Sequence, residues 1–174
     1  SIVFRNARGL QVNLPDILDC QANAQFITEV DLPEHDIAHV YSEVRETNKH
    51  IHFGNSTNLS KIDGKRRGRR VAALINGSQD SSTSNQIWTV DRDFLLDTGR
   101  WKEITIPTSR KGFSITVAVL YGYSGASGKT ADYQANERLI SAALRRARHF
   151  KDIPYILGGD FNITPESSKA ISLA

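Results

Sequence analysis

Residues 154–162 read Pro-Tyr-Ile-Leu-Gly-Gly-Asp-Phe-Asn, and they carry the strongest structural signal in the 174-residue sequence. The apolar run 155–157, with proline before it and glycines after it, predicts a short buried strand. The glycines allow a sharp turn or a close approach to a ligand. Asp160 and Asn162 follow at the end of the strand, and in an extended chain their side chains leave on one face. Such a pair suits a hard metal ion and a phosphate, although an Asx turn that only closes the strand would use the same residues.

Gly-Asp-Phe-Asn after an apolar strand resembles a signature of the endonuclease/exonuclease/phosphatase superfamily, metal-dependent phosphodiesterases that include abasic-site nucleases and retroelement endonucleases. Residues 6–10 follow a β-rich run and resemble the superfamily's first motif, in which the asparagine, here Asn6, lies near the metal and the scissile phosphate. The second polar position of this motif is Arg8, and a basic residue there is found in retroelement-type members. An ordinary strand-to-turn exit closed by Gly9 would explain the same residues.

Residues 25–32, Gln-Phe-Ile-Thr-Glu-Val-Asp-Leu, resemble the superfamily's second motif. The resemblance makes Glu29 the principal metal ligand, at the carboxyl end of a strand in which Phe26 and Ile27 are buried. Open α/β sheets place their sites at such strand ends. Thr28 replaces the usual glutamine, and Glu29 could instead be a solvated acid in an acidic stretch.

The run 113–121 is β-branched and alternating, which predicts a strand that ends at Tyr121. In the superfamily a tyrosine hydroxyl at this place reaches the phosphate, so Tyr121 is the candidate. Tyr123 could supply a similar hydroxyl, and a core tyrosine is the structural alternative.

A helix is predicted over residues 131–150, between this strand and the one that precedes Gly-Asp-Phe-Asn. Its buried stripe is formed by Leu139, Ile140, Ala143, Leu144 and Ala147. Four arginines are expected to face outward: Arg138, Arg145, Arg146 and Arg148.

The other elements follow from periodicity and punctuation. Apolar spacing predicts a helix over 14–24 with Pro15 in its first turn. Pro33 and local alternation predict a strand rather than a helix over 36–41, and 71–75 forms a further strand. Expected core residues are Trp88, Val90, Phe94, Trp101, Ile104 and Ile106.

Two histidine pairs occur, His35 with His39 and His50 with His52. The second pair shares a strand face, yet neither has a cysteine or a third histidine nearby. We therefore expect solvated or hydrogen-bonded histidines rather than a zinc site.

The charge balance permits a nucleic-acid partner, because the formal net charge is +3 and the pI about 9.1. A basic run at 65–70 offers five cations to phosphates, or else forms a solvated hairpin tip or a localisation signal. The basic residues assigned to nucleic acid, DNA in preference to RNA, are Arg8, Lys65, Arg66, Arg67, Arg69 and Arg70.

Cys20 is the single cysteine, so no internal disulfide forms. No apolar run approaches a membrane span; we expect a monomeric intracellular protein, nuclear if the basic run is a localisation signal.

The resemblance implies a fold, a four-layer α/β sandwich in which two packed mixed β-sheets are flanked by helices. A single domain is expected over residues 1–174, covering roughly the first two-thirds of the family fold and incomplete at the carboxyl end. The sequence has no methionine and contains no Ser-Asp-His, the later family motif whose histidine is central to catalysis. We therefore expect a piece of a longer reading frame that is inactive, or nearly so, by itself.

The resemblance also implies a mechanism. Glu29 and Asp160 would hold Mg²⁺ or Mn²⁺, and Asp160 would orient or deprotonate the attacking water. Asn6 and Asn162 would position the carboxylate and the phosphate, and Tyr121 would donate to the phosphate. The favoured activity is a retroelement-like DNA endonuclease; the alternatives are a phosphomonoesterase of the same superfamily and a degenerate relic or binding module without catalysis.

Overall fold

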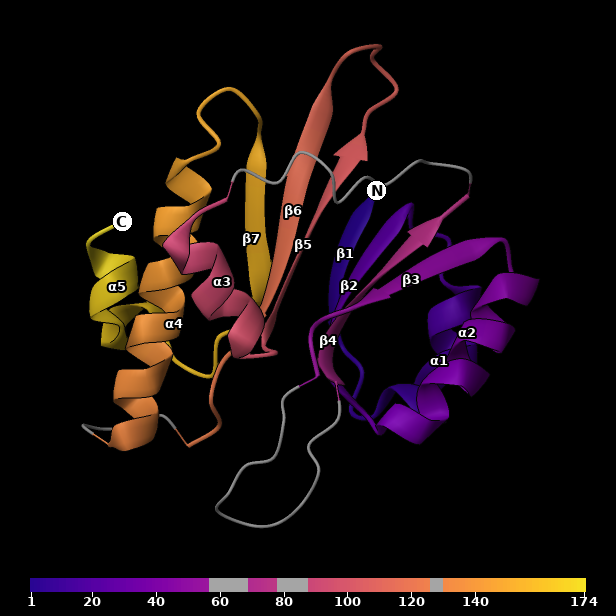
Figure 1. Ribbon diagram of the computed structural model, residues 1–174, viewed down its shortest axis with the longest axis horizontal. Coiled ribbons are helices and arrows are strands. Elements are labelled where there is room, and N and C mark those ends of the chain that lie inside the picture. The colour runs from indigo at the N-terminus through magenta and orange to yellow at the C-terminus, as the bar shows by residue number, and fades with distance from the viewer. Residues whose placement is uncertain (57–68, 78–87, 126–129) are drawn as a thin grey trace.

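The computed structural model of the protein describes residues 1–56, 69–77, 88–125 and 130–174. Two β-sheets pack face to face, with helices on both outer faces, so the molecule has four layers (Figure 1). Both sheets are mixed, and the expected α/β sandwich is confirmed. The first sheet has the order β1 (Ile2–Asn6), β2 (Ala24–Leu32), β4 (Arg69–Asn76), β3 (Lys49–Phe53). The second has the order β5 (Trp101–Pro107), β6 (Ser114–Tyr121), β7 (Tyr155–Asp160).

The helices divide between the two outer faces of the sandwich (Figure 1). The first sheet is covered by α1 (Leu10–Asp19) and α2 (Ile37–Glu46), the second by α3 (Val90–Asp97), α4 (Ala131–Arg148) and α5 (Lys169–Ser172). Short 3₁₀ turns lie at Glu34–Asp36 and Pro165–Ser167. No helix in the described ranges is long and apolar enough to cross a membrane.

Each sheet contains one parallel strand pair joined by a helix. α1 connects β1 to β2, and α4 connects β6 to β7. In these pairs Asn6 lies in register with Thr28, and Tyr121 with Asp160. Each parallel pair therefore ends with polar side chains beside each other at its carboxyl edge.

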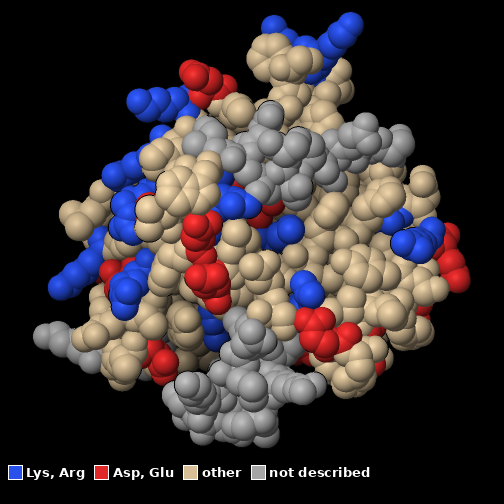
Figure 2. All heavy atoms as spheres, viewed as in Figure 1, with Lys and Arg blue, Asp and Glu red and all other residues tan. Residues whose placement is uncertain are grey.

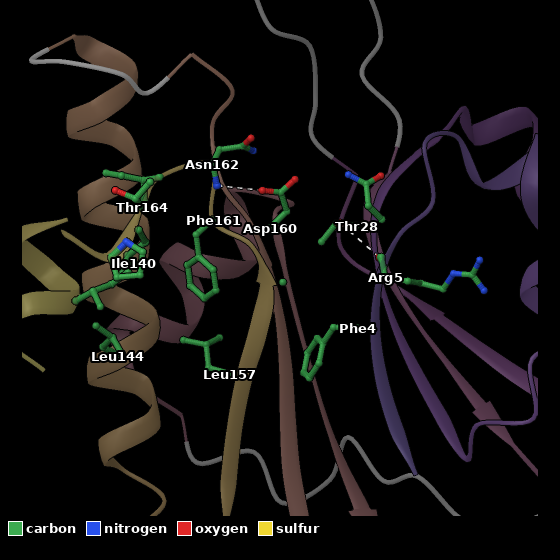
Figure 3. A pocket seen from close by; sticks show the side chains of 15 residues that line it. Phe4, Arg5, Thr28, Ile140, Leu144, Leu157, Asp160, Phe161, Asn162 and Thr164 are labelled. Carbon is green, nitrogen blue, oxygen red and sulfur yellow. Dashed lines mark hydrogen bonds between the residues drawn. The ribbon is translucent and has the colours of Figure 1, made fainter. Parts of the chain in front are cut away.

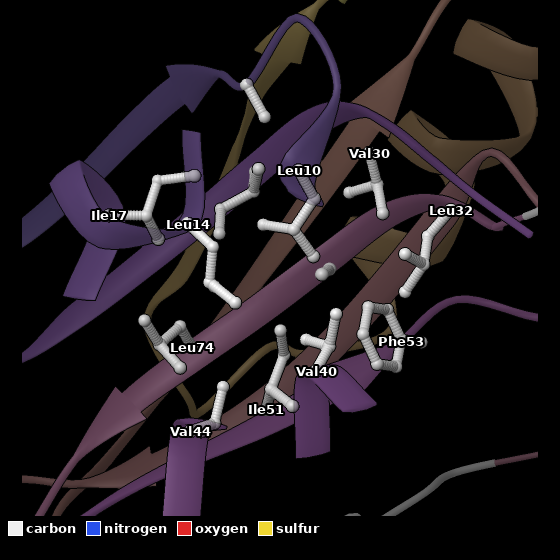
Figure 4. Packing of buried hydrophobic residues seen from close by; sticks show 13 residues of the cluster. Leu10, Leu14, Ile17, Val30, Leu32, Val40, Val44, Ile51, Phe53 and Leu74 are labelled. Atoms are coloured by element: carbon white, nitrogen blue, oxygen red, sulfur yellow. The ribbon is translucent and has the colours of Figure 1, made fainter. Parts of the chain in front are cut away.

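Three apolar layers fill the spaces between the four structural layers. Successive side chains of a strand point to opposite faces, so Phe26 of β2 packs between the sheets and Ile27 packs against α1 and α2. Figure 4 shows the layer beneath α1 and α2, where Leu14, Val40 and Leu74 are buried from three different elements. The buried positions expected for Phe26 and Ile27 are confirmed.

The first helix begins four residues earlier than expected. α1 runs over Leu10–Asp19, and Pro15 lies inside it rather than in its first turn. Leu10, Leu14 and Ile17 form the buried stripe. Pro15 removes a backbone donor on the exposed side of the helix, where packing does not depend on it.

The strand expected over 36–41 is wrong, because this segment forms α2. Pro33 precedes the 3₁₀ turn that leads into α2, so it interrupts no helical hydrogen bond. Val40 and Val44 lie one turn apart and are buried together. His39 consequently lies one turn from Glu43, and its Nε2 is 2.8 Å from the Glu43 carboxylate.

Trp88 and Val90 were expected in the core, and that expectation is wrong. Their exposed fractions are 66% and 73%. Thr89 caps α3 by accepting a hydrogen bond from the Arg92 N–H, which leaves its two neighbours at the exposed start of the helix. Phe94 is half-buried, whereas the core positions expected in β5, Trp101, Ile104 and Ile106, are confirmed.

Arg146 was expected to face outward, and it is fully buried instead. It lies on the apolar stripe of α4 and donates to the Glu103 carboxylate of β5 at 2.8 and 3.2 Å. The Tyr155 hydroxyl donates to the same carboxylate at 2.9 Å. Burial, and then the Glu103 charge, raise the pKa of Tyr155. The amphipathic pattern could not show this pairing, because Glu103 lies 43 residues away on the sheet.

Replacing Arg146 with alanine should destabilise the protein by about 3–5 kcal/mol, because it leaves the Glu103 carboxylate buried without its counter-ion. Urea unfolding followed by circular dichroism measures this loss. The matched control is Arg148→Ala, an exposed position on the same helix, which should change the free energy of unfolding by no more than about 0.5 kcal/mol. Equal effects of the two variants would contradict a structural role for the buried pair.

Candidate active-site cleft

A cleft of about 880 Å³ opens where the carboxyl ends of the two parallel strand pairs meet (Figure 3). Its polar side is lined by Asn6 and Thr28 from the first sheet, by Asp160 at the end of β7 and by Asn162 in the turn that follows. The structure thus brings together three of the residues that the sequence indicated, Asn6, Asp160 and Asn162. Apolar side chains line the rest of the cleft. Phe4 lies on the side of Thr28 and Arg5, and Leu157, Phe161, Ile140 and Leu144 lie on the side of β7 and α4 (Figure 3).

The paired glycines of β7 make this geometry sterically possible. A Cβ on Gly158 would lie 2.6 Å from the Phe4 ring, and a Cβ on Gly159 would lie 2.0 Å from the Leu120 carbonyl oxygen. Gly159 also has a φ of +139°. The glycines therefore let β7 lie close to β1 and β6. β7 is also less buried than its sequence indicated, with Ile156 37% exposed.

The chain turns sharply after β7. Asp160 Oδ1 accepts a hydrogen bond from the Asn162 N–H at 3.1 Å, which is an Asx turn, and Asn162 has a φ of +50°. Asn162 Nδ2 donates to the Gly122 carbonyl at 3.0 Å. Both side chains therefore shape the backbone and also line the cleft. The sequence left an extended chain possible at residues 160–162, and the structure has a turn there instead. Asparagine tolerates the positive φ that this turn requires.

Glu29 lies at an irregularity in β2, directly after the cleft residue Thr28. Its φ is +51°, and the pairing of β2 with β4 shifts register between Thr28 and Leu32. The Glu29 carbonyl accepts from the Gly9 N–H at 2.8 Å, which ties the bulge to the loop after β1. Within the described ranges, its carboxylate has neither a hydrogen bond nor an ion pair. A non-glycine residue held at positive φ in a bulge is a feature that clusters at functional sites.

Tyr121 ends β6 in register with Asp160, but its side chain belongs to the apolar layer between the sheets and is 6% exposed. The Arg100 guanidinium lies 5.1 Å from the Tyr121 ring centroid and 4.0 Å from that of Tyr123. Neither tyrosine lines the cleft.

The basic residues assigned to nucleic acid do not form one surface. Arg8 is exposed at a φ of +48° beside Asn6, whereas Arg69 and Arg70 lie in β4. Arg69 is 3.3 Å from Glu34, and Arg70 is 2.7 Å from Asp31. Figure 2 shows Lys and Arg side chains gathered toward the side that carries α3 and α4, with Asp and Glu between them. The remaining members of the run, Lys65, Arg66 and Arg67, lie outside the described residues.

One residue important for this geometry was missed in the sequence. Asn136 of α4 is fully buried and hydrogen-bonds the loops that follow both β6 and β7. A signal was present, because Asn136 lies three and four residues before Leu139 and Ile140 on the apolar stripe. A polar side chain on such a stripe needs hydrogen-bond partners in the interior.

No family model and no curated protein sequence matches the chain. Solved structures do resemble it. The 3'-5' exonuclease NExo from Neisseria meningitidis covers 94% of this chain, with a TM-score of 0.63 and 17% identity. An AP endonuclease from Archaeoglobus fulgidus covers 94%, with a TM-score of 0.60 and 15% identity. The endonuclease domain of TRAS1, a telomere-specific non-LTR retrotransposon, covers 98%, with a TM-score of 0.56 and 13% identity.

This is the fold of the endonuclease/exonuclease/phosphatase superfamily. The motifs around Asn6, Glu29, Tyr121 and Asp160 indicated that fold, and the structural likeness confirms it. The present chain spans 58% of the length of NExo and of the AP endonuclease, and 66% of the TRAS1 domain.

The oxygen donors on the strand ends fit a hard divalent ion. Mg²⁺ takes one or two carboxylates and keeps several waters. Asp160 lines the cleft at the end of β7, whereas Glu29 lies at the bulge within β2 and does not line the cleft. No group of three or more His, Cys, Asp or Glu side chains that could hold a metal occurs in the part of the chain that the structure describes.

His50 and His52 lie on one face of β3, away from the cleft. His52 is half-buried, and burial, followed by the charges of Lys102 and His50, lowers its pKa below the usual 6.5. The folded state therefore favours the neutral imidazole.

Stability should fall as the pH drops below about 6.5, because the unfolded chain then binds a proton that folded His52 resists. The decrease in the free energy of unfolding is complete once the pH is below the lowered pKa of His52 in the folded state. Urea midpoints at pH 7.5 and 5.5 measure it, and His52→Gln should reduce the difference between them. His35→Gln, at a side chain that is 82% exposed, serves as the control. An unchanged pH dependence in His52→Gln would refute the assignment.

Proposed function

We propose that this protein is a metal-dependent phosphodiesterase, most favoured as a DNA endonuclease. One observation carries the proposal: Asn6, Asp160 and Asn162 line one cleft at the carboxyl ends of β1 and β7. Solved nucleases and phosphatases have the same fold as this chain, and this likeness supports the same assignment.

In this proposal Glu29 and Asp160 hold Mg²⁺ or Mn²⁺. The bound ion would polarise a phosphate oxygen and stabilise negative charge on the leaving oxygen. The positive φ of Glu29 supports a ligand role, because such strain persists where the surrounding structure enforces it.

The remaining residues act on the substrate and the attacking water. Asp160 orients the water or takes its proton. Its Oδ1 accepts the Asn162 N–H, which fixes the carboxylate at the edge of the cleft. Asn6 and Asn162 offer amide groups to the phosphate. Tyr121 has its ring in the core and would donate from its hydroxyl as charge develops on the phosphate.

DNA is the proposed substrate, because it is a polyanion and the chain carries a net positive charge. NExo has been solved with a product DNA hairpin, and the TRAS1 endonuclease belongs to a retrotransposon. In the absence of bound nucleic acid, Arg69 and Arg70 already have acidic partners. Arg8 and the run 65–67 are therefore the proposed phosphate contacts.

We further propose that the 174 residues by themselves cleave weakly or not at all. They contain no Ser-Asp-His sequence, and catalytic groups that act as a unit lose most of their effect when one is missing. A monomeric intracellular protein is the proposed setting.

A phosphomonoesterase is the second candidate. NExo is described as a 3' phosphatase in one of its solved structures, and ANGEL2, which also resembles this chain, as a 2',3'-cyclic phosphatase. The same oxygen donors would serve a terminal phosphate.

Glu29→Gln and Asp160→Asn test the metal site without requiring turnover. Each keeps the shape of the side chain, and the amide oxygen introduced by Asp160→Asn would still accept the Asn162 N–H. Titration of Mn²⁺ followed by electron paramagnetic resonance should show affinity reduced by more than about 10-fold in each, since loss of even an outer-shell partner costs that much. Asp16→Asn, an exposed acid on α1, should leave the affinity unchanged. Equal Mn²⁺ affinity in the unmodified protein and all three variants would remove the proposed metal site.

Nicking of supercoiled plasmid in Mg²⁺, with protein in excess, tests the activity, and inorganic phosphate release from a 3'-phosphorylated oligonucleotide tests the second candidate. If the reading frame continues past Ala174, the longer protein is assayed alongside. Nicking that both Glu29→Gln and Asp160→Asn reduce by about 100-fold or more supports a nuclease. Phosphate release without nicking supports the phosphomonoesterase, and neither activity in the longer protein would support a non-catalytic relic.

A further inference from the structure

We propose that Asn136 is a positioning residue, which holds the loop after β6 and the loop after β7 at a fixed separation. Through Phe161 it sets the placement of Asp160 and Asn162 at the cleft. The effect on metal binding and cleavage rests on the proposed function, whereas the effect on the two loops does not.

The Asn136 amide reaches both loops from a fully buried position on α4. Its Nδ2 donates to the Phe161 carbonyl at 2.7 Å. Its Oδ1 accepts the Tyr123 N–H at 3.1 Å. One side chain therefore joins two backbone segments that lie 38 positions apart in the sequence, counted from Tyr123 to Phe161.

The two loops also contact each other directly through Gly122. The Gly122 N–H donates to the Asp160 carbonyl at 2.7 Å, and the Gly122 carbonyl accepts from Asn162 Nδ2 at 3.0 Å. The same carbonyl accepts from Arg100 Nη1 at 2.7 Å. A Cβ at position 122 would lie 2.1 Å from the Phe161 carbonyl oxygen and 2.8 Å from Asn136 Oδ1. The loops are thus in contact, with no space left between them.

Phe161 lies between Asp160 and Asn162, so fixing its carbonyl fixes the turn that carries both. Asn136 is itself fixed, because Leu139 and Ile140 of the next turn are fully buried against β6 and β7. A buried amide that loses a partner costs free energy. The two hydrogen bonds therefore form together, and they keep the site geometry within the narrow limits that catalysis requires.

Gln25 provides a matched control. It is also a buried amide with two partners: its Nε2 donates to the Ile17 carbonyl at 2.8 Å, and its Oε1 accepts from Arg5 at 3.3 Å. It lies near the beginning of β2 and joins α1 to the sheet, and it does not line the cleft.

Amide hydrogen exchange in Asn136→Ala, Asn136→Asp and Gln25→Ala tests the proposal. In Asn136→Ala the Tyr123 and Asn162 amides should exchange about 10-fold faster, which corresponds to the loss of one ordinary hydrogen bond. Asn136→Asp keeps an acceptor for Tyr123 but lacks the donor to Phe161, so Tyr123 should stay protected while Asn162 does not. Gln25→Ala should leave both amides protected. If Asn136→Ala fails to fold, the Asp variant alone decides, through the contrast between its two amides.

Mn²⁺ affinity, measured on the same variants, should fall in Asn136→Ala and remain unchanged in Gln25→Ala. If both variants lose the two amide protections equally, Asn136 is only a stabilising residue and the proposal is overturned. Uniform protection or uniform exposure of the two amides in Asn136→Asp would overturn it as well. The two amides could respond as expected in a protein that neither binds Mn²⁺ nor cleaves. That result would support the loop positioning and refute the proposed function.

Discussion

The close parallel pairing of β6 with β7 is the constraint on which the rest of the site depends. Gly159 lies so near Leu120 that no side chain fits between them. Gly158 likewise lies close to the Phe4 ring of the other sheet, which leaves no space for a side chain there. These two contacts bring the end of β7 beside the ends of β6 and β1. The polar residues that follow each strand are then neighbours, although their positions in the sequence are far apart.

The loops at this edge are held by hydrogen bonds between backbone groups and side chains, among them the Arg100 guanidinium, which donates to the Gly122 carbonyl. Gly122, Asp160 and Asn162 exchange three main-chain and side-chain hydrogen bonds, and Asn136 adds two from the helix behind them. Such bonds leave the Asp160 carboxylate with acceptor capacity for other partners, since only Oδ1 is engaged by Asn162. An oxygen-rich edge of this kind suits a hydrated hard cation together with a phosphate.

The buried Arg146–Glu103 pair and the candidate cleft both involve α4. The Arg146–Glu103 pair and the Tyr155 hydroxyl lie on the helix-covered face of the second sheet. The cleft extends from the ends of β1 and β7 to Ile140 and Leu144 of α4 (Figure 3).

Local patterns in the sequence predicted the strand that ends at Tyr121, the helix over 131–150 and the strand before Gly-Asp-Phe-Asn, whereas the four-layer architecture followed from the resemblance of the motifs to a known family. The same resemblance grouped Asn6, Asp160 and Asn162, and these three residues line one cleft. Only the tertiary structure decided that 36–41 is helical, since burial of Val40 and Val44 outweighed local alternation. Only it decided that Arg146 is buried and that Asn136 joins two loops. In both cases the partners lie on other elements, and periodicity along one helix carries no information about what that helix packs against.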